Sequence, residues 1–122
     1  MRTGDVYRIK MCQEDGISPK GYDTFRYKYI IIVGNNGNTL CGAVVTNTKD
    51  HPIIPVEFQY PLTHNGYKCF ANCYKLHEIP SNKLTQDCYH GNISMNDCEL
   101  IITCLKTSPV ISKKKLKKFG LI

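Results

Sequence analysis

Tryptophan is absent from this chain of 122 residues, and so is any apolar run long enough to cross a bilayer. The longest apolar run covers residues 29–33, whereas a transmembrane helix needs roughly 20 apolar residues. The first ten residues are polar and charged, so we expect no secretory signal. These absences predict a cytoplasmic protein that has no membrane partner.

The chain also lacks an internal repeat, and its only low-complexity stretch is a lysine-rich end. Its length fits one domain and is sufficient to enclose one hydrophobic core without disulfides or metals. Hydrophobic residues make up 42% of the sequence, which excludes a disordered chain. Tyr, Ile, Val and Thr are frequent, and these residue types favour strands.

The seven cysteines are an odd number, so a complete set of intrachain disulfides would leave one unpaired. We expect free thiols that pack as small hydrophobic side chains in a reducing compartment. Cys69 and Cys73 are close in sequence. No second close pair of cysteines could complete a zinc site with them, and the histidines lack zinc-ligand spacing. The sequence therefore predicts neither a metal nor another cofactor.

The formal net charge of +6 arises from 16 basic and 10 acidic residues, and it is unevenly distributed. Five lysines lie within residues 113–118, and without them 11 basic residues face 10 acidic ones. We therefore divide the chain into a nearly neutral domain, residues 1–110, and a basic C-terminal tail, residues 111–122. Such a tail could contact phosphate, a membrane or an acidic partner, although the ordinary interpretation is a solvated, frayed end.

Short β-forming segments separated by turn residues dominate the first two thirds of the chain. The run of four apolar residues at 30–33 indicates a strand that is buried on both faces. Asn-Gly pairs at 36–37 and 65–66 predict tight hairpins, because both residue types tolerate positive φ angles. The expected strands cover residues 5–11, 26–33, 39–46, 53–58 and 67–76.

The remaining segments predict one short helical turn and one C-terminal helix. Residues 79–84 fit a single turn capped by Ser81. Ser94 followed by Asp97 resembles a capping box, and an apolar stripe with helical spacing continues to Leu105. The helix should end before Pro109. Strands followed by one helix predict a mainly β protein, a small barrel that the helix covers.

Six segments in this order resemble motifs of the MazF/PemK family of toxin endoribonucleases. They are GDVY at 4–7, KYIIIVG at 28–34, AVVTN at 43–47, CFANCY at 69–74, IPSNKL at 79–84 and GNISMND at 91–97. The resemblance extends to about residue 110. It implies an SH3-like β-barrel of the CcdB/MazF type. It also implies a toxin of a toxin–antitoxin pair that works as a homodimer and binds a cognate antitoxin.

The resemblance further implies metal-independent cleavage of single-stranded RNA. The ribose 2′-hydroxyl would attack the adjacent phosphate and leave a 2′,3′-cyclic phosphate and a 5′-hydroxyl. The reaction needs a proton acceptor, a proton donor and a cation for the crowded phosphorane.

The family's key Arg and its Thr or Ser fall by position on Lys28 and Thr46. Asn47 stands where the family usually has Ser, and we expect it to bind RNA. Arg26 and Thr48 share strand faces with Lys28 and Thr46, so they complete the expected catalytic set.

Further RNA contacts are expected from the loops. Residues 12–23 resemble the family's mobile loop beside the substrate groove, and this loop contains Lys20. Tyr27 follows it and offers an aromatic face for a base. His51 and His64 are additional candidates for RNA binding and proton transfer, because histidine titrates near neutrality.

Two other classes of function fit the same sequence. An SH3-like barrel can bind nucleic acid or protein without catalysis, because fold does not determine function. Replacement of the family's Arg by Lys28 and of its Ser by Asn47 favours that alternative. The second alternative is a CcdB-like toxin that acts on a protein target.

Overall fold

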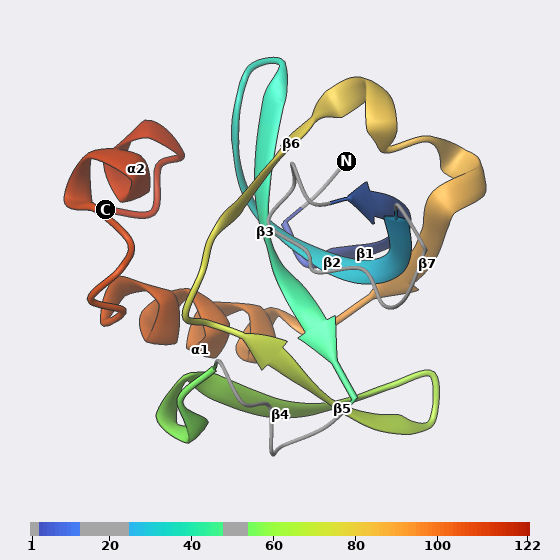
Figure 1. Cartoon of the computed structure of the whole chain (residues 1–122), viewed down its shortest axis with the longest axis horizontal. Coiled ribbons are helices and arrows are strands. Elements are labelled where there is room, and N and C mark those ends of the chain that lie inside the picture. The colour runs from blue at the N-terminus through green and yellow to red at the C-terminus, as the bar shows by residue number, and fades with distance from the viewer. Residues whose placement is uncertain (1–2, 13–24, 48–53) are drawn as a thin grey trace.

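The computed structural model describes residues 3–12, 25–47 and 54–122. It confirms a mainly β protein with an antiparallel seven-stranded sheet and a C-terminal helix (Figure 1). The strands are β1 Asp5–Cys12, β2 Phe25–Asn36, β3 Thr39–Thr46, β4 Gln59–His64, β5 Tyr67–Asn72, β6 His77–Pro80 and β7 Tyr89–Asn92. The helices are α1 Met95–Lys106, α2 Lys113–Lys118 and the short 3₁₀ turns η2 Val56–Phe58, η3 Ser81–Lys83 and η4 Gln86–Cys88.

Strand β3 connects two parts of the sheet. The hydrogen-bonded order is β4-β5-β3-β2-β1-β7, and β6 also pairs with β3. Residues 39–42 of β3 pair with β6, and its last two residues pair with β5 instead. The β4–β5 hairpin therefore lies apart from the β1–β2 ribbon, as Figure 1 shows.

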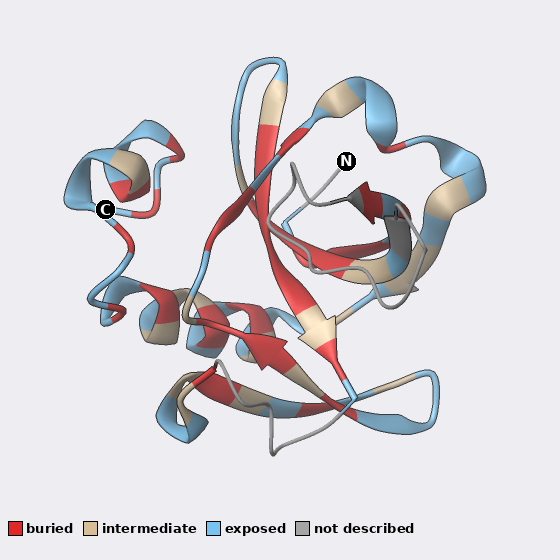
Figure 2. Cartoon of the chain, viewed as in Figure 1, coloured by how far each residue is buried: buried red, intermediate tan, exposed pale blue. Residues whose placement is uncertain are grey.

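Two apolar clusters form the core, and neighbouring residues of β2 supply both. Ile31 and Val33 belong to the cluster that also contains Ile101 and Leu105 of α1. Ile30 belongs to the other cluster, with residues of β1 and β6. The buried positions in Figure 2 follow the sheet and the inner side of α1. The prediction that residues 30–33 are buried on both faces is therefore confirmed, since all four are at most 2% exposed.

Both predicted hairpins are present. Gly37 in the β2–β3 turn has φ 71°, and its amide donates a hydrogen bond to the Asn35 side chain at 3.2 Å. Asn65 and Gly66 in the β4–β5 turn have φ 50° and 82°. The two successive positive φ angles at Asn65 and Gly66 are those of a tight two-residue turn, which matches the twist of the flanking strands.

The strand expected at residues 53–58 is wrong where the structure describes it. The Phe58 amide donates a hydrogen bond to the Pro55 carbonyl at 3.0 Å, which closes the 3₁₀ turn η2. Proline cannot donate a ladder hydrogen bond and suits the start of such a turn. The strand begins only at Gln59, whose side-chain amide donates to the Ile54 carbonyl at 2.7 Å.

The end of β5 and the start of η3 also differ from expectation. β5 ends at Asn72 and does not continue to residue 76, because the Asn72 side chain accepts hydrogen bonds from the amides of Tyr74 and Lys75. Ser81 does not cap η3; Pro80 occupies the N-cap position, and no side-chain hydrogen bond caps the turn.

The C-terminal helix α1 matches its prediction. The Ser94 side chain accepts a hydrogen bond from the Asp97 amide at 3.1 Å. Cys98, Ile101 and Leu105 are its buried residues, and the helix ends before Pro109. No described helix is long and apolar enough to cross a membrane.

The expectation of a solvated tail at residues 111–122 is wrong. Its lysines form α2, capped by Ser112, and four of its apolar residues are buried in the cluster that contains Ile101 and Leu105 of α1. The Lys115 ammonium donates a hydrogen bond to the Leu76 carbonyl at 2.6 Å. The buried apolar residues are Ile111, Leu116, Phe119 and Leu121. The segment therefore shares the core of the domain.

Candidate functional site

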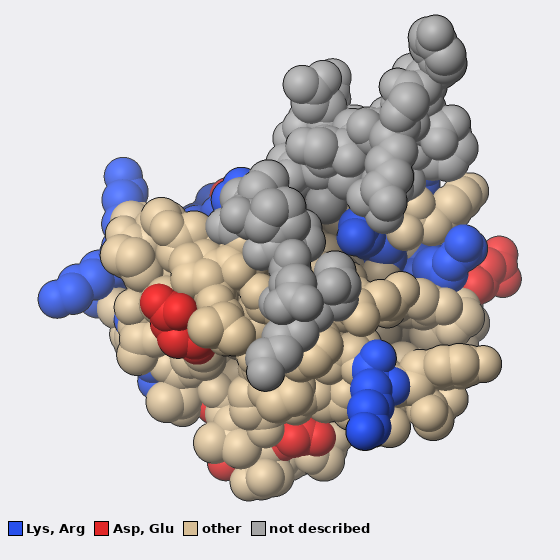
Figure 3. Space-filling model, turned by 60° about the horizontal axis from the view of Figure 1, so that its bottom comes forward, with Lys and Arg blue, Asp and Glu red and all other residues tan. Residues whose placement is uncertain are grey.

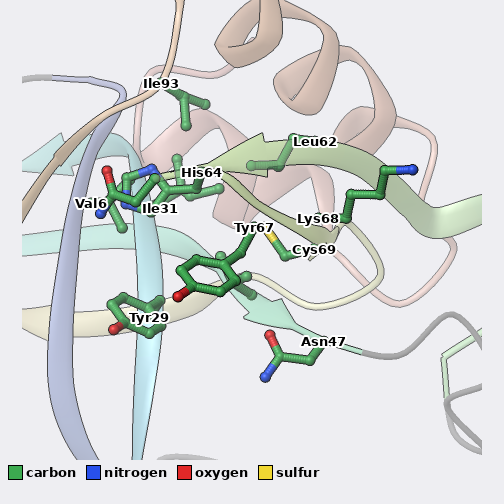
Figure 4. Close-up of a pocket in the computed structure, with 12 residues that line it drawn as sticks. Val6, Tyr29, Ile31, Asn47, Leu62, His64, Tyr67, Lys68, Cys69 and Ile93 are labelled. Atoms are coloured by element: carbon green, nitrogen blue, oxygen red, sulfur yellow. The ribbon is translucent and has the colours of Figure 1, made fainter.

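A hollow of about 420 Å³ lies between the β1–β2 ribbon and the β4–β5 hairpin (Figure 4). Buried apolar side chains of the core form part of its wall, including Val6, Ile31 and Leu62. Aromatic and polar residues complete it. The full lining is Val6, Tyr29, Ile31, Val45, Asn47, Leu62, His64, Asn65, Tyr67, Lys68, Cys69 and Ile93.

Strand periodicity explains why these residues meet. Tyr29 and Ile31 are two apart on β2, and Val45 and Asn47 are two apart at the end of β3, so each pair lies on one face. The β4–β5 hairpin pairs with the end of β3 and supplies the opposite wall. The hollow therefore lies where β3 changes its partner from β6 to β5 and where its pairing with β2 ends.

The Tyr29 ring contacts the imidazole rings of two histidines. The His90 ring of β7 is 5.2 Å from the Tyr29 ring, and the His64 ring is 6.4 Å from it, both in edge-to-face geometry. Such pairs are favourable because the positive ring edge meets the negative face of its neighbour. Tyr29 is therefore held in a fixed orientation on the wall of the hollow.

His64 offers an unused polar atom inside the protein. Its Nε2 is buried and has no hydrogen-bond partner among the described residues. Gly91 lies close by, because a Cβ at Gly91 would be 3.6 Å from the His64 Cε1. A buried ring nitrogen without a partner costs free energy, and a bound molecule that supplies a donor or an acceptor would recover it.

Polar and aromatic side chains surround the opening. Asn47 and Lys68 are exposed, and Tyr67 is 78% exposed. Figure 4 shows the Tyr67 ring pointing toward Tyr29 and the Lys68 ammonium pointing away from the hollow. An apolar wall, two aromatic rings and a few polar groups suit a planar heteroaromatic ring such as a nucleobase.

Lys28 of β2 and Thr46 of β3, two of the predicted catalytic residues, lie on the opposite face of the sheet from the hollow. Lys28 is half-buried and pairs by register with Ile9 of the second core cluster. Thr46 is 6% exposed, and its hydroxyl donates a hydrogen bond to the Phe70 carbonyl at 3.5 Å. The pairing of β2 with β3 ends at Ile30 and Val44. Lys28 lies two residues before Ile30, and Thr46 lies two residues after Val44.

The structure thus divides the predicted set between two faces. Lys28 and Thr46 follow the parity of Ile30 and Val44, whereas Asn47 and His64 line the hollow. Tyr27 has the parity of Tyr29 and continues the face of the hollow. Lys20, Thr48 and His51 lie outside the described residues. Arg26 pairs by backbone with Met11, and its side chain is outside the description.

Among the aromatic and charged residues at the site, Tyr29, Tyr67, Lys68 and His90 were not predicted from the sequence. Tyr29 begins the apolar run at residues 29–33 and was not singled out as a binding residue. The alternation of Tyr27 with Tyr29 was an available signal, because two aromatic residues two apart share a strand face. His90 offered no such signal, since only the pairing of β7 with β1 brings it to the site.

The thiols add no reactive centre to this site. Cys69 is buried on its wall, and burial raises the pKa of its thiol while the His64 backbone partly offsets the effect. All six cysteines with described side chains are free. In the described ranges, no group of three or more His, Cys, Asp or Glu residues could hold a metal ion.

Charge is spread around the molecule. Figure 3 shows Lys and Arg side chains toward both sides of one face, with acidic groups among them. Arg8 and Lys10 of β1 are exposed near the hollow. The lysines of α2 belong to another region, where Lys118 and Lys115 contact Glu78.

No protein-family model matches this chain, and no curated protein resembles it closely enough in sequence to count as a relative. The likeness to MazF/PemK toxins therefore stays a prediction that rests on the motifs. The function has to be argued from the geometry of the site.

Proposed function

We propose that this protein is a metal-independent endoribonuclease of a toxin–antitoxin pair that binds single-stranded RNA and places one base in the hollow. The observation that carries the proposal is the meeting of Tyr29, His64 and Asn47 around one cavity with an apolar wall. Tyr29 offers a stacking surface, His64 a buried ring nitrogen and Asn47 an amide for a base edge.

The arrangement of the strands supports an SH3-like barrel of the CcdB/MazF type. One strand, β3, belongs to both parts of the sheet, so the β4–β5 hairpin turns away from the β1–β2 ribbon. The helix α1 packs on the core, where Ile101 and Leu105 belong to the same apolar cluster as residues of β2 and β5. The sequence resemblance implies a small barrel with one C-terminal helix, and a sheet divided in this way together with α1 supports that architecture.

Lys28 and Thr46 are the proposed catalytic pair. The 2′-hydroxyl gives its proton to a water molecule and its oxygen attacks phosphorus, the P–O5′ bond breaks, and the leaving 5′-oxygen takes a proton from water. Lys28 supplies positive charge for the phosphorane, and Thr46 supplies a hydroxyl. Thr46 and Asn47 are neighbours at the end of β3, so RNA crossing that end would reach both faces.

The test is cleavage of single-stranded RNA in the presence of EDTA, with mass spectrometry of the new ends. The wild type should leave 2′,3′-cyclic phosphate and 5′-hydroxyl ends, and Lys28→Ala should lower the rate at least tenfold. His64→Ala should weaken RNA binding. Lys114→Ala is the matched control, since it removes an exposed charge on α2. Equal rates for the wild type and Lys28→Ala would refute the catalytic assignment.

A binding module without catalysis is the second candidate. Lysine cannot grip phosphate through two parallel hydrogen bonds as arginine does, and the Thr46 hydroxyl already has a protein partner. RNA that binds tightly but keeps its length would establish this function. Growth arrest with intact RNA would instead indicate a CcdB-like toxin with a protein target.

The proposal includes a cytoplasmic homodimer and an antitoxin partner. Met95 and Leu100 of α1 are 70% and 45% exposed, which leaves apolar surface for a second subunit. Light scattering after size-exclusion chromatography tests the dimer. Co-expression with the product of the adjacent upstream gene tests the antitoxin, which should restore growth.

A further inference from the structure

Beyond the hollow, the same face of the β1–β2 ribbon carries alternating aromatic and basic side chains. The register places Lys10 opposite Tyr27 and Arg8 opposite Tyr29. Directly opposed residues on antiparallel strands lie on one face. Arg8, Lys10 and Tyr27 are all exposed, whereas Tyr29 is half-buried at the hollow.

Arg8 and Tyr27 form a cation–π contact along the diagonal of this face. The guanidinium carbon of Arg8 lies 4.3 Å from the centre of the Tyr27 ring. Tyr27 nevertheless remains 51% exposed. The contact restricts the ring before any ligand arrives, so less conformational entropy is lost on binding.

The spacing of the two tyrosines selects for a particular form of nucleic acid. Residues two apart on a strand are separated by roughly 6.6 Å. Stacked bases in a helix are only about 3.4 Å apart. Bases held by Tyr27 and Tyr29 would therefore be unstacked from each other, which a single strand permits and a duplex opposes.

The basic side chains of this face are placed to contact the RNA phosphates between two such bases. Arg8 and Lys10 stand beside the tyrosines on the neighbouring strand, where phosphates would pass. Arginine can bind phosphate and also stack on an aromatic ring, so Arg8 can serve both contacts. Exposed lysine contributes a charge that makes binding depend on salt.

We propose that Tyr27, Arg8 and Lys10 form a second nucleotide subsite next to the hollow, so that this face binds two consecutive nucleotides of single-stranded RNA. The inference rests on the proposed RNA function. It adds the subsite and two cations that the resemblance did not indicate.

The experiment measures binding by fluorescence anisotropy. The probe is a labelled random-sequence RNA of about 12 nucleotides, methylated at its 2′-oxygens so that it cannot be cleaved, either alone or annealed to its complement. Tyr27→Ala should weaken binding to the single strand about tenfold, because one stacked base is lost. Tyr27→Phe keeps the ring and should bind within about twofold of the wild type.

The basic residues are tested through salt. Arg8→Ala and Lys10→Ala should each reduce the slope of log affinity against log salt by about 0.7 for a single strand. Lys114→Ala removes an equally exposed charge from α2 and should leave the slope unchanged. Thermal unfolding confirms that each variant is folded.

The possible failures are distinguishable. If the wild type binds and His64→Ala weakens it while Tyr27→Ala does not, the second subsite is refuted and the proposed function stands. Equal affinity for the annealed probe also refutes the subsite. If the wild type binds no RNA, both proposals are refuted.

Discussion

Gly34 lies against the backbone of Phe119, at the place where the C-terminal segment packs on the β2–β3 hairpin. A Cβ on Gly34 would stand 2.8 Å from the Phe119 carbonyl oxygen and 3.1 Å from the Cys41 Sγ. Real Cβ atoms do not approach a backbone oxygen so closely, so a side chain here would displace the segment. The docking of residues 111–122 therefore depends on a glycine about 80 positions earlier.

Gly34→Ala should lower the free energy of unfolding by about 2 kcal/mol through this clash. Urea unfolding followed by circular dichroism measures the loss, and limited proteolysis should cut the C-terminal segment faster. Gly37→Asn is the control: nothing lies within 4 Å of a Cβ there, and asparagine tolerates the φ of 71°. Equal stability of Gly34→Ala and the wild type would contradict the close packing.

Tyr60→Phe should destabilise the protein by about 1–2 kcal/mol, because a charged acceptor loses its donor. The Tyr60 hydroxyl donates a hydrogen bond to the Asp97 carboxylate at 2.9 Å and so joins β4 to α1. The same denaturant titration measures the loss. Tyr67→Phe removes a hydroxyl from a residue that is 78% exposed and should change stability by less than about 0.5 kcal/mol. Similar losses of unfolding free energy in both variants would show that the hydrogen bond to Asp97 does not stabilise the protein.

Cys41 should resist alkylation in the native protein. Burial raises the pKa of its thiol to about 12, and Lys115 only partly offsets this. At pH 8 roughly one thiol in ten thousand is then a thiolate, which is the reactive form. Iodoacetamide labelling followed by peptide mass spectrometry should modify Cys88, which is half-exposed, long before Cys41. Rapid labelling of Cys41 without unfolding would contradict its burial.

The contact between Glu78 and Lys118 should make stability depend on pH in the acid range. The Lys118 hydrogen bond at 2.9 Å lowers the pKa of Glu78 from its ordinary value of 4.5, while desolvation partly opposes this. The unfolded chain then binds the proton more readily, so this stabilisation is present above pH 4.5 and is lost as the pH falls through the lowered native value. Because both side chains are exposed, the effect should stay below about 1 kcal/mol.

The measurement compares urea unfolding of the wild type and Glu78→Gln at pH 6 and pH 3. At pH 6 the wild type should have a higher free energy of unfolding than Glu78→Gln. At pH 3 the two proteins should have equal values. A gap that is the same at both values would show that the carboxylate charge is not involved.

Local chemistry made much of the fold predictable. The Asn-Gly turns, the apolar run at 30–33 and the Ser94 cap each depend on residues close in sequence, and all are present. The segment at 111–122 was predicted wrongly because lysines dominate its composition. Leu116 and Phe119 become core residues only through contact with distant strands, and local charge gives no sign of that.

The site was predictable only in part for the same reason. Asn47 and His64 were expected to bind RNA, and the structure brings them to one hollow. Tyr29 and His90 belong to strands that are distant in sequence, and the edge-to-face contact between them depends on the pairing of β7 with β1 and of β1 with β2. The turn residues in the sequence do not determine the order of the strands in the sheet, so the contact between Tyr29 and His90 could not be predicted.

β3 has one edge paired with β2 and the other paired first with β6 and then with β5. Separating it would break its pairing with β2, β5 and β6 at once. Among the described residues, no other strand joins the β4–β5 hairpin to the rest of the sheet. The amide protons of Val44 and Val45 should therefore exchange with solvent only when the whole molecule opens. In this fold, resistance to fluctuation is concentrated in the strand whose end borders the proposed RNA site.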